Sequence, residues 1–429
     1  MGSKLRLLDE IGDAVDDAGG GDAMVCDLFS GSGVVSSFLG LRHRVVAVDI
    51  QEYARVLASA VLMEREVRPI ELSSLIAPAE EDAIGRELLD AFAPLIDHEA
   101  ECVDRARDGD AGPLADLIGL GSVVGMDGSV PAPAEGKQAF AKVTDRLSQD
   151  RLRQASLVSR YYGGLYFSYR HAIDLDVLLA RVAALPKALQ DIGKAVVLST
   201  ASELVRTVGK QFAQPLRPRN KDGGPKPSLW RTVEKARAVD PVRVVEEQAR
   251  AYLAKAPARA GGVAVRADYR DFLHDCGNEI GVVYADPPYT RDHYSRFYHV
   301  LETMCLRDHP ALSRTNLNGG RAVSRGAYRK DRHQSPFCIR SQAPDAFEQL
   351  FKLVAERGAN LVLSYSPQAE GDRVHPRVMR LEDVLRLARC RFRSIEVRRS
   401  DTVTHSKLNR TDLHLDTPEA AEVLVVCKQ

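Results

Sequence analysis

Short apolar runs bounded by turn residues recur near both ends of the chain, and longer amphipathic stretches fill its middle. A short apolar run between breakers is typical of a buried strand. The runs that predict strands lie at residues 23–29, 44–49, 263–269, 280–285, 359–366, 392–399 and 422–427. Helical patterns follow several of these runs, at residues 34–39, 346–358 and 381–390. Strands that alternate with helices predict an α/β fold.

The middle of the chain is dominated by helical patterns. Residues 71–107, 172–186 and 193–209 have apolar positions at helical spacing, whereas residues 111–139 are rich in Gly, Pro and Ala and predict an irregular loop. We therefore expect a largely helical unit that interrupts the α/β domain. The expected segments are residues 1–66 for the first part of the α/β domain, 67–257 for the inserted unit and 258–429 for the second part of the α/β domain.

The composition favours an intracellular protein with two domains. The chain has 429 residues and 45% hydrophobic content, which is enough for a large core. Its seven cysteines are scattered singly, without a Cys-x-x-Cys pair, as is usual in a reducing compartment. No apolar run approaches the roughly 20 residues of a membrane helix, and no signal-peptide pattern opens the chain. We therefore expect a cytoplasmic protein that does not act at a membrane.

The most informative short segment is Asp286-Pro287-Pro288-Tyr289, which follows the apolar run at residues 280–285. Two prolines fix φ and remove two backbone donors, so the chain leaves the strand stiffly, with carbonyls that no sheet ladder uses. An acid beside such carbonyls, with an aromatic ring three residues further on, suits a flat molecule that carries an exocyclic amino group. A nucleobase fits this description. The alternative is a surface strand that ends in prolines.

A second site pattern follows the run at residues 23–29. Gly31 and Gly33 allow the backbone to turn sharply and to approach a ligand closely. The next run ends at Asp49, sixteen residues after Gly33, and in nucleotide sites such an acid accepts hydrogen bonds from ribose hydroxyls. Because the third glycine of the dinucleotide pattern is absent, an ordinary tight turn is the alternative.

Together these motifs resemble the DNA adenine-N6 methyltransferases that use S-adenosylmethionine, in the Dam-like α-group. That family has a Gly-Ser-Lys motif, then Phe-x-Gly-x-Gly, then a target-recognition insert, then Asp-Pro-Pro-Tyr. This chain has the same order, with Gly-Ser-Lys at residues 2–4, Phe-x-Gly-x-Gly at 29–33 and Asp-Pro-Pro-Tyr at 286–289. The resemblance covers about residues 2–60 and 258–429.

The resemblance implies a fold, a cofactor and a set of site residues. The fold is a Rossmann-like seven-stranded methyltransferase sheet with one antiparallel hairpin and a largely helical inserted target-recognition domain at residues 67–257. The cofactor is S-adenosylmethionine, and Asp268 corresponds to the acid that contacts its adenine ring. The residues implied to bind the cofactor are Lys4, Asp27, Phe29, Gly31, Gly33, Asp49 and Asp268.

The chemistry expected of the proline-rich motif follows from the weak nucleophilicity of adenine. The lone pair of the exocyclic nitrogen is delocalised into the ring, and two acceptors can localise it toward the sulfonium methyl group. We expect Asp286 and the carbonyl of Pro287 to accept the two N–H groups, and Tyr289 to stack on the base. In duplex DNA this nitrogen is inside the base stack, so the nucleotide has to be flipped out.

The residues after the motif predict substrate contacts and no metal. Arg291 and Tyr294 lie nearest to Asp286 in the sequence, and we expect both to meet DNA. His293 and His299 are present, but no second ligand pair has metal spacing, so we expect no metal site.

The formal net charge is zero, yet the charges are segregated along the chain. Residues 206–235 contain eight basic and two acidic residues, residues 321–340 contain six basic and one acidic residue, and residues 80–110 contain eleven acids against three arginines. Two basic loops can follow a phosphate backbone while the acidic region faces away; solvated surface is the alternative. The residues that we expect to contact phosphates are Arg217, Arg219, Lys221 and Lys226.

An aromatic cluster lies within the expected insert. Residues 161–169 contain five aromatic side chains around two glycines, and we expect Tyr162 to stack on bases or to act as a wedge. Packing in the core of the insert is the alternative.

We conclude from the sequence that the chain is an enzyme that methylates adenine N6 in double-stranded DNA. A cognate restriction or defence nuclease is the expected partner. Cytosine N4 and RNA adenine are alternative substrates, since the motif recognises an amine rather than a sugar. A protein glutamine amide is less favoured, because those enzymes usually begin the motif with Asn. A catalytically inactive DNA-binding module is the alternative of another class, and the intact Gly31, Gly33, Asp49 and Asp286 argue against it.

Overall fold

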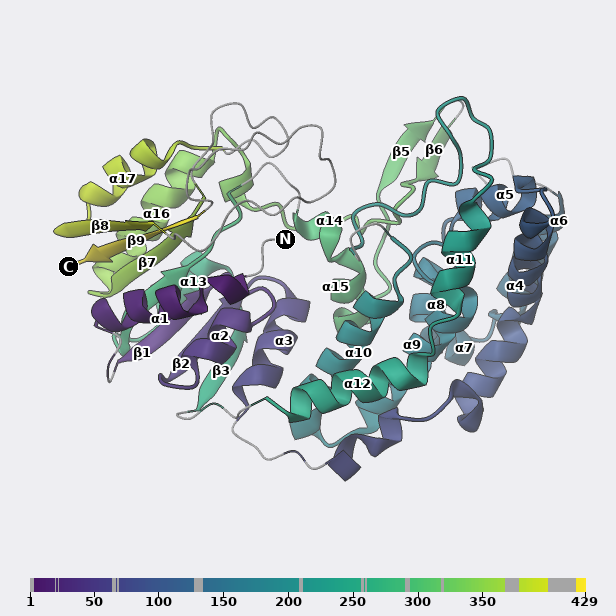
Figure 1. The fold of residues 1–429 in the computed structure, drawn as a ribbon, viewed down its shortest axis with the longest axis horizontal. Helices are drawn as coiled ribbons and strands as arrows, with labels where there is room; N and C mark the ends of the chain where they lie inside the picture. Colours follow the sequence, from purple (N-terminus) through teal and green to yellow (C-terminus); the bar gives the residue numbers. More distant parts are fainter. Residues whose placement is uncertain are drawn as a thin grey trace. The chain divides into compact units, whose positions relative to one another are not determined.

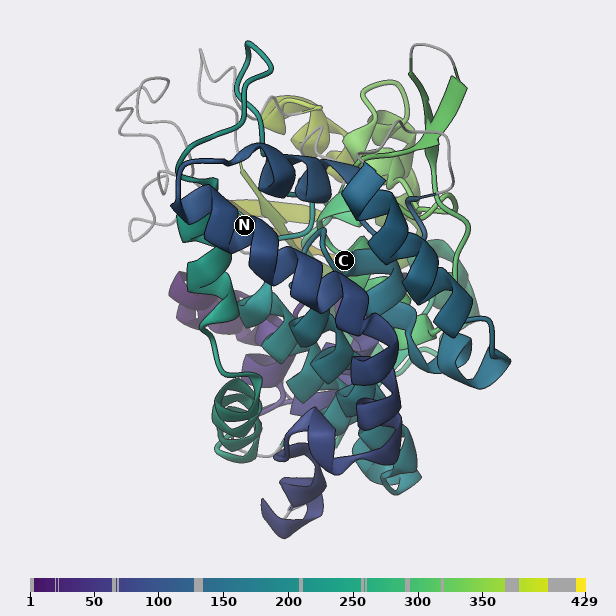
Figure 2. The ribbon, with the colours of Figure 1, turned by 90° about the vertical axis from the view of Figure 1, so that its right-hand side faces the viewer.

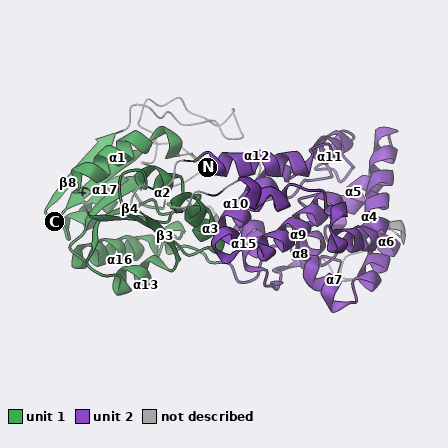
Figure 3. Cartoon of the chain, turned by 90° about the horizontal axis from the view of Figure 1, so that it is seen from below, with its two compact units in different colours: residues 1–66, 255–294, 333–429 green, residues 67–254, 295–332 purple. Residues whose placement is uncertain are grey.

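The computed structural model of the protein consists of two compact units (Figures 1 and 3). Unit 1 comprises residues 1–66, 255–294 and 333–429, and unit 2 comprises residues 67–254 and 295–332. The structure describes the chain except for residues 1–3, 20, 22, 64–66, 68, 127–133, 208–210, 256–257, 259–260, 290–293, 318–319, 367–377 and 400–421. Within the described chain, no helix is both long enough and apolar enough to cross a membrane.

Unit 1 is built on a seven-stranded mixed sheet with the order β3-β2-β1-β4-β7-β9-β8. Its strands are β1 (Met24–Leu28), β2 (Val45–Asp49), β3 (Gly262–Arg266), β4 (Ile280–Ala285), β7 (Asn360–Tyr365), β8 (Ser394–Arg399) and β9 (Val423–Lys428). The first five strands of the order are parallel, and β9 runs antiparallel to both of its neighbours. The expected α/β class, the seven strands and the single antiparallel element are confirmed.

Helices cover both faces of this sheet (Figure 1). One face packs against α13 (Tyr269–Asp275), α16 (Ala343–Glu356) and α17 (Leu381–Arg389), and alternate strand residues such as Cys26 and Leu28 join that core. The helices α1 (Leu8–Asp17), α2 (Val34–Leu39) and α3 (Glu52–Leu62) lie over the other face. Burial on both faces explains why the central strands read as continuous apolar runs in the sequence.

The parallel strands bring the sequence motifs to one edge of the sheet. In the register of β1, Leu28 pairs with Val48 of β2 and with Ala285 of β4, so these three strands end at the same level. The residues that follow therefore share one edge, and they include the glycine loop and Asp286. Open α/β sheets bind ligands at this carboxyl edge.

Unit 2 is mainly helical (Figure 2). Its helices are α4 (Ala83–Arg107), α5 (Gly112–Leu120), α6 (Ala134–Arg146), α7 (Asp150–Ala155), α8 (Leu157–Tyr162), α9 (Tyr169–Ala184), α10 (Gln190–Leu204), α11 (Leu229–Arg237), α12 (Pro241–Leu253) and α15 (His299–Leu306). A two-stranded hairpin of β5 (Arg314–Leu317) and β6 (Gly320–Val323) also belongs to it. Residues 295–332 thus group with the helical unit, although they lie within the range that the sequence pattern assigned to the α/β domain.

Two helix predictions for unit 2 were wrong in detail. The helix expected over residues 71–107 is divided into three elements. Short 3-10 turns cover Pro69–Leu75 and Ala79–Glu81, and α4 begins only at Ala83. Pro78 lies between the two turns, and a proline disfavours a continuous helix through this point. The irregular loop expected over residues 111–139 contains α5 and the beginning of α6. Leu114, Leu117 and Ile118 have helical spacing and are buried in the core of unit 2, and this burial outweighs the local glycines and prolines.

The aromatic cluster at residues 161–169 lies inside unit 2. Tyr162 has no exposed surface, and its hydroxyl donates a hydrogen bond to Thr303 Oγ1 at 2.9 Å. Tyr166 is also fully buried and bonds to the carbonyl of Phe212 at 2.9 Å. A side chain in this position cannot stack on a base, so the prediction that Tyr162 contacts DNA is wrong for this conformation, and the alternative of core packing describes it.

Candidate functional site

Asp286 lies in a cluster of charged side chains that come from distant parts of the sequence. Lys4 Nζ is 3.1 Å from Asp286 Oδ1 and also forms an ion pair with Glu422. Ser364, on β7, accepts a hydrogen bond from Lys4 Nζ at 3.0 Å and donates one to Glu422. The Asp286 side chain keeps 29% of its surface exposed, while Lys4 and Glu422 each keep 13%. Asp286 is therefore the member of the cluster that remains most accessible to a ligand.

The cluster changes the pKa values of its members. Burial raises the pKa of Asp286 to about 6, Lys4 opposes this rise, and the neighbouring carboxylate of Glu422 reinforces it. The pKa of Lys4 is raised well above its ordinary value, because the charge of Asp286 and the other nearby groups outweigh the opposite effect of burial. Lys4 thus stays a cation, and Asp286 ionises close to neutral pH.

The backbone after Asp286 offers one carbonyl to which no described residue donates a hydrogen bond. The carbonyl of Pro288 accepts from the Cys338 thiol at 3.3 Å, and the carbonyl of Tyr289 accepts from the Val378 amide at 3.3 Å. Among the described residues, none donates to the carbonyl of Pro287. Asp286 and the Pro287 carbonyl can therefore act as two adjacent acceptors. The Tyr289 ring is partly buried against Tyr365, with 5.1 Å between ring centroids.

The loop between β1 and α2 has three residues with positive φ: Phe29 (64°), Gly31 (53°) and Gly33 (72°). A Cβ atom on Gly33 would lie 2.9 Å from Ala58 Cα, so close packing of α3 requires glycine there. A Cβ atom on Gly31 would meet nothing closer than 3.8 Å. Gly33 is thus needed for packing, whereas the space beside Gly31 is open to a ligand.

Asp49 is the acid at the end of β2, and it faces this loop. Its Oδ2 accepts from the Gly31 amide at 3.1 Å and its Oδ1 accepts from the Gln51 amide at 2.9 Å. Asp27 is different, because it is only 1% exposed and accepts a hydrogen bond from the Ser36 hydroxyl. Burial raises the pKa of Asp27 to about 7 against the effect of Ser36, and the nearby charges of Asp286 and Asp49 contribute to the rise. The enclosed position of Asp27 favours a role in holding the loop.

Asp268 follows β3 at the same edge of the sheet. It accepts from the Arg270 amide at 2.9 Å as the N-cap of α13, and it forms an ion pair with the Arg270 side chain at 2.9 Å. Next to it, the rings of Phe29, Tyr269 and Phe337 pack together, with centroids 5.4 Å apart in each pair. An acid beside an aromatic wall suits a flat heterocycle with an amino group.

The basic residues expected to contact DNA lie in different settings. Arg219 is neutralised by an ion pair with Asp116, whereas Lys221 is exposed and Lys226 is partly exposed. Arg291 and the side chain of Tyr294 lie outside the described parts of the structure.

Arg217 belongs to a group of four arginines, which we call the guanidinium cluster. Arg217 comes from the first basic segment, Arg325 and Arg332 come from the second, and Arg296 lies between the two segments in the sequence. Tyr328 organises this cluster. The guanidinium carbons of Arg296 and Arg332 lie 5.5 and 5.2 Å from the centroid of its ring. Arg325 donates to the carbonyl of Leu216, which brings it beside Arg217. Burial lowers the pKa of Arg325, and the charge of Arg217 lowers it further. Within the described residues, no carboxylate forms an ion pair with any of the four arginines.

Sequence reasoning missed three residues of the charged cluster around Asp286. Glu422 and Ser364 have no local motif, and they meet Lys4 only because β9 lies beside β7. Tyr284 lies on β4, two residues before Asp286; it is buried, and its hydroxyl has no hydrogen-bond partner among the described residues. The alternation of side chains along β4 could have placed Tyr284 on the face of Asp286.

A seven-stranded mixed sheet whose parallel strands end at an acidic, glycine-lined edge is compatible with a methyltransferase fold. The comparison with protein families narrows this class: residues 1–82 match the model of the D12 class N6 adenine-specific DNA methyltransferases. The match indicates that the protein is a DNA adenine methyltransferase. No curated protein matches the chain.

Proposed function

We propose that the protein transfers a methyl group from S-adenosylmethionine to N6 of an adenine that has been flipped out of double-stranded DNA. The observation that carries the proposal is the pair of adjacent acceptors at the end of β4. They are the carboxylate of Asp286 and the carbonyl of Pro287, which accepts no hydrogen bond from the described residues. An exocyclic amine has two N–H groups, and these acceptors can bind both. The two bonds localise the nitrogen lone pair and orient it for attack.

The residues around Asp286 prepare it for this task. Lys4 and Ser364 fix the cluster in place, and the ion pair with Lys4 favours the ionised carboxylate. Glu422 acts in the opposite direction, because its charge favours the protonated form of Asp286. In our proposal Lys4 stabilises the ionised carboxylate of Asp286. The resemblance to the Dam-like group implies that Lys4 also contacts the cofactor. Tyr289 provides an aromatic face for the flipped base.

The residues of the sheet edge suit S-adenosylmethionine, which supplies an electrophilic methyl group when bound. We propose that Asp49 binds the ribose hydroxyls beside the open space at Gly31. Asp268 and the aromatic wall at Phe29 would hold the adenine moiety. Asp27 and Gly33 would support the loop from inside. The open space beside Gly31 leaves room for the ribose next to Asp49.

We propose that unit 2 is the target-recognition domain and that its guanidinium cluster binds the DNA backbone. These arginines have no carboxylate partner among the described residues and can bind phosphates, and the ring of Tyr328 orients two of them. Lys221 and Lys226 extend the basic surface, whereas Arg219 is already neutralised. Cytoplasmic location and a role beside a restriction or defence nuclease stay predictions.

Parallel methyl-transfer assays with duplex DNA, single-stranded RNA and protein test the proposal. The assay uses S-adenosylmethionine with a tritiated methyl group, wild-type protein and Asp286→Ala, and calorimetry confirms that the variant still binds the cofactor. We expect transfer to duplex DNA, and a loss of at least about 100-fold in the variant, since the removal of one oriented acceptor costs roughly 3 kcal/mol in the transition state. Transfer to RNA or protein alone, or near-normal transfer by the variant, would contradict it.

A further inference from the structure

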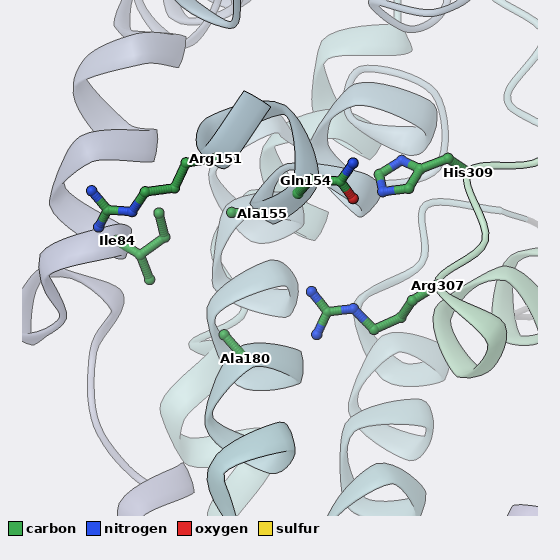
Figure 4. Close-up of a pocket in the computed structure, with 7 residues that line it drawn as sticks. All are labelled: Ile84, Arg151, Gln154, Ala155, Ala180, Arg307 and His309. Carbon is green, nitrogen blue, oxygen red and sulfur yellow. The ribbon is translucent and has the colours of Figure 1, made fainter. Parts of the chain in front are cut away.

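Unit 2 contains a pocket that lies outside every residue assigned above to catalysis, to the cofactor or to the guanidinium cluster (Figure 4). Its volume is about 430 Å³, within the range of small-molecule sites. Four polar side chains line it: Arg151 and Gln154 on α7, and Arg307 and His309 just after α15. Ile84, Ala155 and Ala180 form an apolar part of its wall.

The lining of the pocket is electropositive. No acid is among its lining residues. Arg307 donates to the carbonyl of Leu179 at 3.2 Å, and within the described chain no carboxylate forms an ion pair with it. Arg151 forms only an exposed ion pair with Glu87 at 3.0 Å. Burial lowers the pKa of His309, and the positive charges of Arg160 and Arg307 lower it further. The nearby charge of Asp308 opposes this effect on His309, and the buried Asp176 interacts electrostatically with Arg307, but neither acid lines the pocket. An anion in the pocket would contact Arg307 directly.

The backbone at the pocket is strained. Arg307 has a φ of 50° and His309 a φ of 45°, and neither is a glycine. Left-handed backbone at a residue with a side chain costs roughly 1 kcal/mol or more, and such residues are concentrated at functional sites. The same structure has another such residue, Phe29, in the loop that we assign to the cofactor. Arg307 is the C-cap of α15, so its left-handed backbone ends the helix beside the pocket that Arg307 and His309 line.

The arrangement of the lining suggests the kind of anion. Figure 4 shows the guanidinium group of Arg307 pointing toward the space beside Ala155 and Ala180, with the carboxamide of Gln154 next to the ring of His309. A planar guanidinium group can donate two parallel hydrogen bonds to two oxygens of one phosphate. The carboxamide can donate and accept, as the edge of a base requires, and the alanines leave room for a sugar or ring. The volume exceeds what a lone phosphate fills.

We propose that this pocket is a second ligand site, which binds one nucleotide through its phosphate on Arg307 and through the edge of its base on Gln154. The nucleotide is either a unit of a DNA strand or a free nucleoside monophosphate, since both present the same phosphate chemistry. The site is distinct from the catalytic one, and its occupancy does not require methyl transfer.

Calorimetry on the full-length protein with dTMP tests the site, because a thymine nucleotide avoids both adenine sites of the proposed reaction. The variants are Arg307→Gln, which removes the charge, and Ala155→Leu, which fills the pocket and keeps every charge. The matched control is Arg243→Gln, an exposed arginine on α12 that pairs with Glu247. Thermal unfolding by circular dichroism confirms that each variant is folded. Thymidine and inorganic phosphate serve as partial ligands.

We expect dTMP to bind, with at least tenfold weaker affinity in Arg307→Gln and in Ala155→Leu and unchanged affinity in the control. Thymidine should bind at least tenfold more weakly than dTMP, and inorganic phosphate should compete. Competition between dTMP and a 12-nucleotide DNA strand would identify DNA as the source; binding without competition would identify a free nucleotide. The proposal is overturned if dTMP does not bind, or if Ala155→Leu binds dTMP normally. Either failure leaves the methyl-transfer proposal intact.

Discussion

The pH dependence of methyl transfer should report the ionisation of Asp286. Burial raises its pKa to about 6, against the opposing charge of Lys4. The ionised carboxylate is the form that accepts an amine N–H, so activity is present above this pKa and is lost as the pH falls through it. At pH 5 about a tenth of Asp286 stays ionised, so the single-turnover rate should fall about tenfold from its plateau, whereas an ordinary aspartate would remain ionised there.

Two variants should shift this profile in opposite directions. Lys4→Gln removes the cation 3.1 Å from Asp286, and the acidic limb should move up by about 1–3 pH units, the usual effect of a close opposite charge. Glu422→Gln removes the neighbouring carboxylate that raises the pKa, so the limb should move down. The control is Glu396→Gln, which removes an exposed carboxylate on β8 and should leave the limb in place.

Single-turnover methylation of one duplex from pH 4.5 to 9, with cofactor and DNA saturating at each pH, separates the chemical step from binding. The three variants and the wild type are compared on the same duplex. An acidic limb near pH 4 in the wild type would refute the elevated pKa of Asp286. Limbs that move together in Lys4→Gln and Glu422→Gln would refute the electrostatic coupling.

Three further predictions concern the cofactor, DNA and the core of unit 2. Asp49→Ala should weaken cofactor binding by about 1–3 kcal/mol, because hydroxyls then lose a charged acceptor; unchanged affinity by calorimetry would place the ribose elsewhere. Replacement of all four arginines of the guanidinium cluster by Gln should reduce the salt slope of DNA binding by up to about 3.6 units, and Arg243→Gln should not; an unaltered slope would leave the cluster as solvated surface. Tyr162→Phe should cost about 1 kcal/mol of unfolding free energy in urea and leave duplex methylation unchanged; a specific loss of DNA binding without a stability change would contradict its assignment to the core.

The sheet could be predicted from the sequence because its strands are buried on both faces and separated by clear breakers. The run at residues 280–285 coincides with β4, and the other runs differ from their strands by a few residues at the ends. The positions of the acids at the carboxyl edge could be predicted from the same pattern. Parallel strands that end at the same level bring Asp49 and Asp286 to one edge of the sheet.

The surroundings of these acids could not be predicted in the same way. Lys4 and Glu422 are 418 positions apart, and the sequence around each residue does not indicate that the two form an ion pair. The aromatic side chains at residues 161–169 would look the same in a stacking surface and in a core, and only the helices packed around Tyr162 decide between the two. The basic segments could be identified in the sequence, but the ion pair between Arg219 and Asp116 depends on tertiary contacts.

Mass spectrometry of nucleosides from methylated DNA identifies the base and the atom that receive the methyl group. Duplex DNA without prior methylation is incubated with S-adenosylmethionine and either the wild-type protein or Asp286→Ala, and then digested completely. We expect N6-methyldeoxyadenosine with the wild type and at least about 100-fold less with the variant. N4-methyldeoxycytidine as the product, or equal amounts of N6-methyldeoxyadenosine from both proteins, would contradict it.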